Sequence, residues 1–289
     1  MLKIEGLGKN YGGESWALRR FSLDLEHGVF GLLGPNGAGK SSLMEILSAG
    51  MDFDEGSARL DDRIDLRRNA PAWRGRLGYM PQSFDFPPHT TGREVLAEAA
   101  AQQGISPPAI RARIEALLER VNLQWAAARP AAEYSRGMKQ RLGFALAVLH
   151  GPSLLLLDEP TAGLDPVERT IFRDLLAEIS RGMTVILSTH LVGDVERCCD
   201  RVGVLSRGAL VYTGTPWDLA GAAQGRVWEA LMDDAEAERQ IATRRVVSVR
   251  RTEGRLLARI VSESAPSPEA QPVAPTLEDG YVLLIEGSA

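Results

Sequence analysis

The chain has 289 residues, of which 44% are hydrophobic and 25% are charged, as in a soluble globular protein with one large domain or two smaller ones. Lysine and arginine (33) against aspartate and glutamate (38) give a net charge of −5, which argues against a dominant nonspecific nucleic-acid surface. No run of 18 apolar residues occurs and residues 1–5 do not begin a signal sequence, so we expect no membrane-spanning helix and no leader.

The first part of the chain is predicted to consist of short strands and one helix. Between residues 2 and 33, apolar and polar positions alternate between glycines, a pattern typical of strands. A helix is predicted over Lys40–Leu47. Strand-like pieces return between residues 56 and 80 and end in Leu77–Met80.

The middle of the chain is predicted to be mostly helical. From Gly92 to about Ala128 apolar residues recur at helical spacing, until Arg and Pro at 129–130 break the pattern. A second helical pattern follows Ser135 and stops at Gly151. The residues that share one face of the first pattern are Ile110, Ile114, Leu117, Leu118 and Val121. We therefore expect a helical insertion over about residues 83–150.

Strands and helices alternate after this insertion. Leu154–Leu157 is a continuous apolar run, as expected of a buried parallel strand. A helix is predicted over Val167–Ile179 and a strand over Thr184–Leu187, and this alternation indicates a parallel α/β core. Cys198 and Cys199 are adjacent, and because such neighbours rarely form a disulfide, we expect packed thiols in a reducing compartment.

The character of the sequence changes after residue 215. A Pro-rich linker is predicted at about residues 265–276, and a last apolar strand at Tyr281–Ile285. Shorter strands with a charged segment between them are predicted at Val227–Met232, Val246–Val249 and Leu256–Val261. We expect one domain over residues 1–215 and a small accessory domain over 216–289. The latter fits either a packing appendage or a regulatory or dimerising domain.

A phosphate-binding loop is the most informative motif. It fits G-x-x-x-x-G-K-[ST] and stands between a predicted strand and a predicted helix, which is the context this motif requires. Its glycines let successive N–H groups point at phosphate oxygens, and the positive end of the following helix adds to that field. Lys40 can reach the β- and γ-phosphates, and Ser41 can ligate Mg²⁺. A glycine-rich turn that binds nothing is the alternative, but the flanking elements favour a nucleoside triphosphate site. The loop residues are Gly34, Pro35, Asn36, Gly37, Ala38, Gly39, Lys40, Ser41 and Ser42.

Two carboxylates and a histidine follow neighbouring apolar strands. Asp158 and Glu159 stand at the strand end that faces the ligand crevice of an open α/β sheet. Asp158 is suited to hold Mg²⁺ or its waters, and Glu159 to polarise the water that attacks the γ-phosphate. His190 could contact the γ-phosphate and keep Glu159 and the water in line. An isolated Asp-Glu pair or a lone histidine often has only a structural role, but the nearby phosphate loop favours chemistry.

Taken together, these residues resemble the ATP-binding subunit of an ABC transporter. The resemblance covers about residues 2–215, with the motifs in the family's order. It implies an α/β fold with a P-loop NTPase core of the ABC ATPase type, an antiparallel β subdomain, an inserted helical subdomain and a small C-terminal α+β appendage. It also implies an ATPase that uses ATP and Mg²⁺.

The resemblance implies roles for further residues. Tyr11 looks like the aromatic residue that stacks on adenine in this family. Gln82 resembles the loop glutamine that touches Mg²⁺ and links the nucleotide to the helical subdomain. Asp165 belongs to the Gly-Leu-Asp loop that faces the partner subunit. The pair Asp158 and Glu159 matches the magnesium and catalytic carboxylates, and the histidine matches the family's switch histidine.

The diagnostic L-S-G-G-Q motif is represented by Tyr-Ser-Arg-Gly-Met at residues 134–138, which departs from it at Tyr134, Arg136 and Met138. Ser135 and Gly137 remain, and they supply a hydroxyl and an open backbone at a helix N-terminus, so we expect binding of the partner's ATP to survive. This variant looks like the ATPases of bacterial exporters for drugs, lipids or envelope polymers.

The family mechanism implies partners and a location. Two such subunits sandwich two ATP molecules head to tail, and hydrolysis removes contacts that hold them closed. The resemblance implies a second copy of this chain and an integral-membrane permease as partners, with no nucleic acid. It places the chain peripherally at the cytoplasmic face of the inner membrane.

Two other interpretations are weaker. A soluble ABC-type ATPase acting on DNA or ribosomes usually carries two ATPase units, a coiled-coil insertion or zinc cysteines, and this sequence has none of them. A binding-only module with a dead site is disfavoured because Lys40, Glu159 and His190 are all retained.

Overall fold

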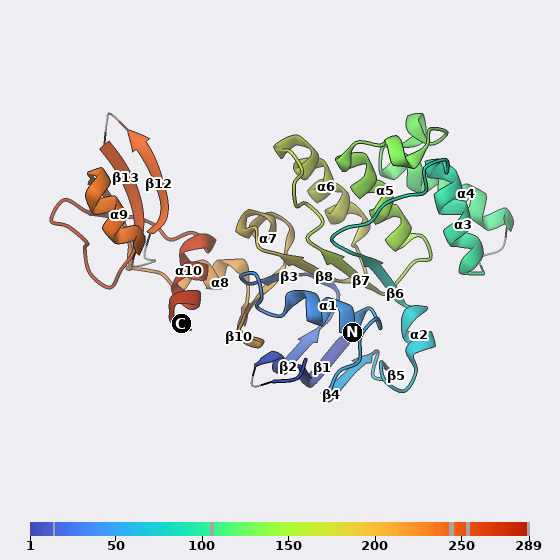
Figure 1. Ribbon diagram of the computed structural model, residues 1–289, viewed down its shortest axis with the longest axis horizontal. Coiled ribbons are helices and arrows are strands. Elements are labelled where there is room, and N and C mark those ends of the chain that lie inside the picture. Colours follow the sequence, from blue (N-terminus) through green and yellow to red (C-terminus); the bar gives the residue numbers. More distant parts are fainter. Residues whose placement is uncertain (14, 105–106, 243–245, 253–254, 288–289) are drawn as a thin grey trace.

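The computed structural model describes residues 1–13, 15–104, 107–242, 246–252 and 255–287 (Figure 1). A six-stranded sheet lies at its centre, with helices above it in the view and an antiparallel sheet below. A separate four-stranded sheet near the C-terminus lies to the left. The mixed α/β fold expected from the sequence is confirmed.

The central sheet has the strand order β10-β9-β3-β8-β7-β6. Its members pair in parallel except β10, which runs antiparallel to β9. Strands β7 and β8 are buried along their whole length, because elements cover both faces of the sheet. The strands are β3 (Gly28–Leu33), β6 (Leu77–Met80), β7 (Leu154–Asp158), β8 (Thr184–Thr189), β9 (Arg201–Ser206) and β10 (Ala209–Gly214).

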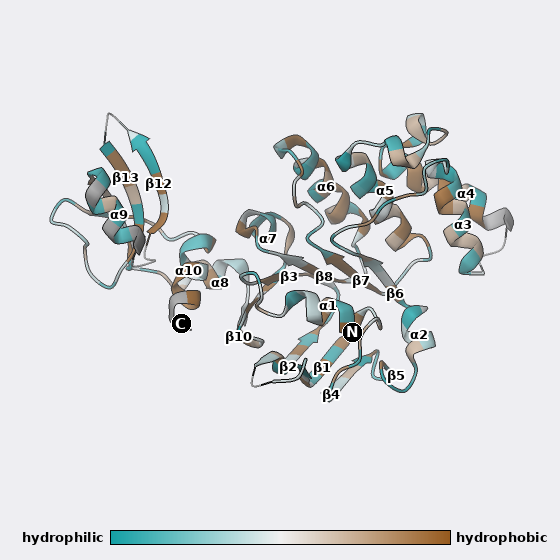
Figure 2. Cartoon of the chain, in the orientation of Figure 1, coloured by the Kyte–Doolittle hydropathy of each residue, from teal (hydrophilic) through white to brown (hydrophobic). Residues whose placement is uncertain are grey.

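Alternate side chains of the central strands enter two different cores. Leu154 and Leu156 of β7 pack into a cluster shared with the antiparallel sheet and with helix α1 (Lys40–Leu47). Leu155 and Leu157 enter the cluster formed with the helices on the other face. The central strands carry the hydrophobic colour in Figure 2. A two-residue period therefore accounts for both layers.

The N-terminal sheet is antiparallel, with the order β2-β1-β4-β5. A short helix that contains the fully buried Trp73 lies beside this sheet. The indole N–H of Trp73 donates to the carbonyl of Leu47 at 2.7 Å and holds the helix in place. The elements are β1 (Leu2–Asn10), β2 (Trp16–Leu25), β4 (Glu55–Leu60), β5 (Ile64–Asp65) and α2 (Ala70–Arg74).

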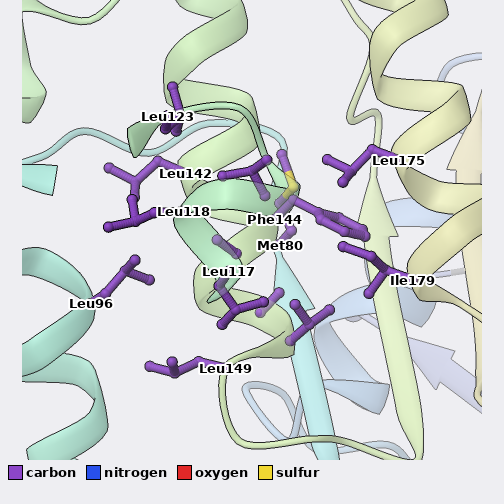
Figure 3. Close-up of a cluster of buried hydrophobic side chains, with 14 of the residues drawn as sticks. Met80, Leu96, Leu117, Leu118, Leu123, Leu142, Phe144, Leu149, Leu175 and Ile179 are labelled. Carbon is purple, nitrogen blue, oxygen red and sulfur yellow. The ribbon is translucent and has the colours of Figure 1, made fainter. Parts of the chain in front are cut away.

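The predicted helical insertion contains three helices and two 3-10 turns among the described residues. Four of the residues predicted to share a face are buried: Ile114, Leu117, Leu118 and Val121. Figure 3 shows Leu117 and Leu118 in one cluster with Phe144. The elements are α3 (Gly92–Gln102), α4 (Pro107–Arg120), η1 (Gln124–Ala126), η2 (Ala131–Glu133) and α5 (Arg136–Val148).

Two helices follow the central strands and complete the upper layer. Helix α6 (Pro166–Ile179) packs on α5 through an edge-to-face contact between Phe172 and Phe144, whose ring centroids are 5.4 Å apart. Helix α7 (Val192–Cys198) follows β8. Cys198 and Cys199 are free thiols, and burial raises the pKa of both.

The C-terminal region contains a four-stranded sheet of order β12-β13-β11-β14 with a helix on one face. Its three longer strands confirm the strands predicted there. The elements are α8 (Pro216–Gly221), β11 (Val227–Met232), α9 (Asp234–Ala242), β12 (Val246–Thr252), β13 (Arg255–Val261), β14 (Gln271–Pro272) and α10 (Leu277–Gly287). Strand β14 lies inside the predicted Pro-rich linker. The boundaries at 83–150, 215/216 and 265–276 stay predictions.

The predicted strand at Tyr281–Ile285 is wrong, because these residues belong to helix α10. The Asp279 carboxylate accepts hydrogen bonds from the Thr276 N–H (2.6 Å) and hydroxyl (2.7 Å), an interaction that begins a helix. Gly280 then lies against the Leu219 carbonyl of α8, where an added Cβ would be 1.8 Å from that oxygen. A short apolar run does not distinguish a strand from a buried helix, and the Thr-x-x-Asp pattern was the missed signal.

Candidate active site

A cavity of about 320 Å³ lies beside the carboxyl ends of β3 and β7. Its wall brings together predicted residues that are up to 148 positions apart in the sequence, and Ala17 is the lining residue that the sequence analysis missed. Its methyl group carries no chemical signal. The lining residues are Tyr11, Ala17, Asn36, Gly37, Gly39, Lys40, Ser41, Ser42, Gln82, Asp158 and Glu159.

The loop at residues 34–39 depends on glycine at two positions. Gly37 and Gly39 have φ angles of +78° and +108°, in the left-handed region that glycine adopts readily. At Gly39 an added Cβ would also lie 2.2 Å from the Ala17 carbonyl oxygen. The N–H of Ala38 donates to the carbonyl of Pro35 at 3.2 Å, which closes the loop before α1 begins. The backbone is thus held in the shape of a phosphate cradle.

Lys40 folds back over this loop. Its ammonium group donates to the carbonyl oxygens of Gly34 at 2.6 Å and Pro35 at 3.2 Å, and only 7% of the residue is exposed. Burial lowers the pKa of Lys40, and the negative charges of Glu159 and Asp158 oppose that effect. The cation therefore lies in the cradle with carboxylates close enough to act on it.

Asp158 has the surroundings expected of a metal ligand. The residue is 5% exposed, and its Oδ1 atom has no hydrogen-bond partner among the described residues. Burial raises the pKa of Asp158, and the neighbouring charge of Glu159 acts in the same direction while Lys40 opposes both. Asp158 lines the cavity together with Ser41 and Gln82, and the carboxylate, hydroxyl and amide oxygens of these residues are of the kind that Mg²⁺ prefers.

Glu159 and His190 are in direct contact. The Nδ1 atom of His190 lies 2.8 Å from Oε2 of Glu159, with the glutamate buried and the imidazole half exposed. Glu159 has a φ of +49°, which is uncommon for a residue with a side chain, and its N–H donates to the Ser188 carbonyl at 2.9 Å. Glu159 lines the cavity next to Asp158.

Tyr11 lies at the edge of the cavity with 63% of its surface exposed. Its hydroxyl is 3.0 Å from the Ser42 Oγ and 3.2 Å from the Met51 sulfur. The Lys9 ammonium lies 5.9 Å from the ring centroid. The ring is thus attached to the loop and remains largely exposed.

Seven predicted site residues do not line this cavity: Gly34, Pro35, Ala38 and His190, which adjoin or contact residues that do, and Ser135, Gly137 and Asp165. Ser135 is the N-cap of α5, where its hydroxyl accepts from the Met138 N–H at 3.2 Å. Gly137 lies against the Glu168 side chain, so that an added Cβ would clash. Asp165 is the N-cap of α6 and accepts from two backbone N–H groups at 2.9 Å. No pattern in the sequence indicates the packing of Glu168 on Gly137.

A phosphate loop on a parallel sheet, with two carboxylates at the end of a nearby strand, defines a P-loop nucleoside triphosphatase. The profile of the family described as "ABC transporter" matches residues 18–162, about half of the chain. The chain belongs to this ABC transporter family and is the ATP-hydrolysing subunit of a transporter. No helix in the described part of the chain is both long and apolar enough to cross a membrane.

Relatives with curated names fit this assignment. The chain is 36% identical to the uncharacterized ABC transporter ATP-binding protein YxlF of Bacillus subtilis (strain 168), over 79% of this chain and 75% of that protein. It is 34% identical to the linearmycin resistance ATP-binding protein LnrL of the same strain, over 76% and 70%. It is 38% identical to the Nod factor export ATP-binding protein I of Bradyrhizobium diazoefficiens, over 74% and 70%.

Solved structures have the same fold. An ATP-binding subunit of an ABC transporter is 27% identical and superposes with a TM-score of 0.69 over 76% of this chain and 92% of that chain. The cbiO1 protein of Clostridium perfringens, described as part of the ABC transporter complex cbiONQ, is 29% identical with a TM-score of 0.68 over 75% and 89%.

Proposed function

We propose that two copies of this chain close around two ATP molecules and drive a separate membrane permease, with export as the direction of transport. Each ATP lies between the phosphate loop of one copy and the segment containing Ser135 and Gly137 of the other. Each chain then contributes one half of each of the two sites. The cargo passes through the permease and does not touch this subunit.

The observation that carries this proposal is the division of the site within one chain. The cavity contains the loop, the carboxylates and Gln82, whereas Ser135 and Gly137 lie at the N-terminus of α5 and do not line it. That helix end offers N–H groups and a positive dipole, the usual surroundings of a phosphate. In the proposed dimer, a second copy of the chain brings the N-terminus of its α5 to this cavity. Val167, two residues after Asp165, exposes 70% of its surface, which is consistent with a face that a second copy covers.

Different residues of the chain carry out different parts of the proposed reaction. Mg²⁺ would be held by Ser41, Gln82 and Asp158, and supplies charge neutralisation at the phosphates. The Glu159 carboxylate orients the attacking water and accepts its proton as the water oxygen bonds to the γ-phosphorus and ADP leaves. His190 holds Glu159 through the 2.8 Å contact.

The permease is expected at the helical insertion. An apolar groove of about 320 Å³ is lined by residues that follow Gln82 in the sequence, which include Phe84, Phe86, Val95 and Ala99. A polypeptide segment of the permease that packs there would be linked to the nucleotide through Gln82. The relatives named for Nod factor export and linearmycin resistance support export, and a permease partner places the chain at the cytoplasmic face of the inner membrane.

The test uses the Glu159→Gln chain, which keeps the side-chain shape but lacks the base. Size-exclusion chromatography with light scattering should show a monomer without nucleotide and a dimer with ATP and Mg²⁺, because turnover cannot release the contacts. Wild-type turnover by Glu159→Gln would remove this carboxylate from the mechanism.

Two substitutions at Ser135, each placed in the Glu159→Gln background, test the trans contact. Asparagine and aspartate both cap helices about as well as serine, so both should preserve α5. Ser135→Asn should still allow the dimer, whereas Ser135→Asp should abolish it, because a second negative charge then faces the phosphate. Equal dimerisation of the two variants would contradict the proposed sandwich.

A further inference from the structure

A buried hydrogen-bonded network joins three segments behind the active site. The Asp194 carboxylate, with no exposed surface, accepts from the Thr161 hydroxyl through Oδ2 and from the Arg173 guanidinium through Oδ1. The Arg173 Nε to Oδ1 distance is 3.0 Å. Thr161 is 2% exposed, so water has little access to the network from that side.

The network connects the two segments that hold Glu159 and His190. Thr161 follows Glu159 by two residues, inside a turn in which the Ala162 N–H donates to the Glu159 carbonyl at 3.1 Å. Asp194 follows His190 by four residues, in the first turn of α7, and its N–H donates to the Leu191 carbonyl at 3.0 Å. The Asp194 carboxylate thus bridges the turn after one predicted catalytic residue and the helix after the other.

Glu159 needs such a restraint because its backbone is in an unfavourable conformation. A φ of +49° costs an L-residue with a side chain about 1–2 kcal/mol and persists only where the surroundings impose it. On one side, the bond from the Glu159 N–H to the Ser188 carbonyl ties it to β8. On the other side, the Thr161 hydroxyl is tied to Asp194.

Arg173 fixes the Asp194 carboxylate in place. Its guanidinium donates twice to Oδ1, so that Oδ2 is left for Thr161, and both carboxylate oxygens are committed. An ion pair at this depth is more effective in fixing geometry than in adding stability, since desolvation offsets much of the attraction. Arg173 lies on α6, whose N-cap is Asp165.

We propose that Asp194 is a positioning residue for ATP hydrolysis: it holds the turn after Glu159 and the helix after His190 in one arrangement, so that the 2.8 Å contact between these two side chains forms. The proposal rests on the proposed function, in which Glu159 and His190 act on the attacking water. Asp194, Thr161 and Arg173 do not line the nucleotide cavity. Their loss should therefore affect turnover and spare ATP binding.

The first experiment measures kcat and KM for ATP with the full chain. Asp194→Asn should lower kcat by about 10- to 100-fold with KM within about twofold of wild type, because small misplacements of catalytic groups have effects of this size. Turnover is normalised to binding-competent protein, counted with a fluorescent ATP analogue. Glu196→Gln, an exposed carboxylate on the same helix, is the matched control and should retain wild-type kcat.

Two substitutions at Thr161 keep the proposal testable if Asp194→Asn misfolds. Thr161→Ser keeps the donor to Asp194 and should keep kcat within about threefold of wild type, whereas Thr161→Val removes the donor at equal size and should lose about tenfold or more. Wild-type kcat in Thr161→Val would overturn the proposal.

A double-mutant cycle with His190→Ala separates positioning from general packing. If Asp194 acts through the Glu159–His190 contact, adding Asp194→Asn to His190→Ala should lower normalised kcat by less than about twofold further. Fully additive losses would show an independent structural effect and overturn the proposal. If Glu159→Gln and His190→Ala kept wild-type turnover, the proposed function would fail instead, whatever Asp194→Asn does.

Discussion

The central parallel sheet and the C-terminal antiparallel sheet serve different purposes in this chain. Strands β7 and β8 are buried on both faces, and polar residues follow them at their carboxyl ends, where Asp158, Glu159 and His190 gather. The C-terminal sheet packs one face on α9, while much of β12 is exposed and hydrophilic (Figure 2).

The difference shows how strand direction concentrates chemistry. In the parallel sheet the residues after several strands meet at one edge, so chemical groups far apart in sequence converge. In the antiparallel sheet consecutive strand ends lie at opposite edges, and Asp279 of α10, which accepts hydrogen bonds from Arg259 of β13, fixes structure. Changes at the first sheet should therefore alter ATP binding and turnover, and changes at the second should alter stability.

The largest expected effect is in the C-terminal region. Asp279 is fully buried and accepts hydrogen bonds from Arg259 and from Thr276. Asp279→Ala should lower the unfolding free energy by about 3–5 kcal/mol, because the Arg259 guanidinium and the Thr276 N–H and hydroxyl all lose their charged acceptor. Chemical denaturation measures this, and calorimetry with ATP should show unchanged affinity. A large loss of ATP affinity would break the comparison.

An exposed ion pair in the same region provides the control. Asp234 pairs with Arg251 at 3.1 Å, and both side chains are more than half exposed. Asp234→Ala should cost less than about 1 kcal/mol, since water and salt screen such pairs.

The next effect is at the phosphate loop. Lys40→Ala should weaken ATP binding by about 3 kcal/mol, roughly a hundredfold in Kd, because charge-assisted hydrogen bonds to the phosphates are lost. Unfolding free energy should not fall, since the ammonium group is buried at a cost. Calorimetric titration tests the affinity, with the exposed Lys3→Ala as control. Unchanged affinity in Lys40→Ala would refute its assigned role.

The smallest effect is a pH dependence at Asp158. Burial raises the pKa of this carboxyl in the folded chain above the ordinary 3.8, so ionisation opposes folding. The resulting penalty is absent below 3.8, grows as pH rises and is complete above the folded-state pKa. In the absence of nucleotide, Asp158→Asn should be more stable than wild type at pH 7, with the difference shrinking as pH falls toward 4. Denaturation curves at several pH values measure it, and a constant difference would contradict it.

The sequence was sufficient to predict the elements and residues whose chemistry is local. The phosphate loop, the apolar strands and the polar residues after them have fixed spacings, and the fold they imply is confirmed. Ala17 and Asp194 could not be predicted, because one contributes only a small side chain and the other acts through contacts with distant segments. Helix α10 was misassigned because its apolar run outweighed a capping signal.

The left-handed backbone at Glu159 lowers the stability of the fold at the residue that we propose activates the attacking water. Glycine adopts that conformation without the steric cost. The unfolding free energy of Glu159→Gly should therefore be about 0.5–1 kcal/mol higher than that of wild type, after allowing for the greater freedom of glycine in the unfolded chain. If Glu159 activates the attacking water as proposed, selection for heat resistance alone would then favour chains that no longer hydrolyse ATP. Stability and catalysis would thus favour different residues at this one position.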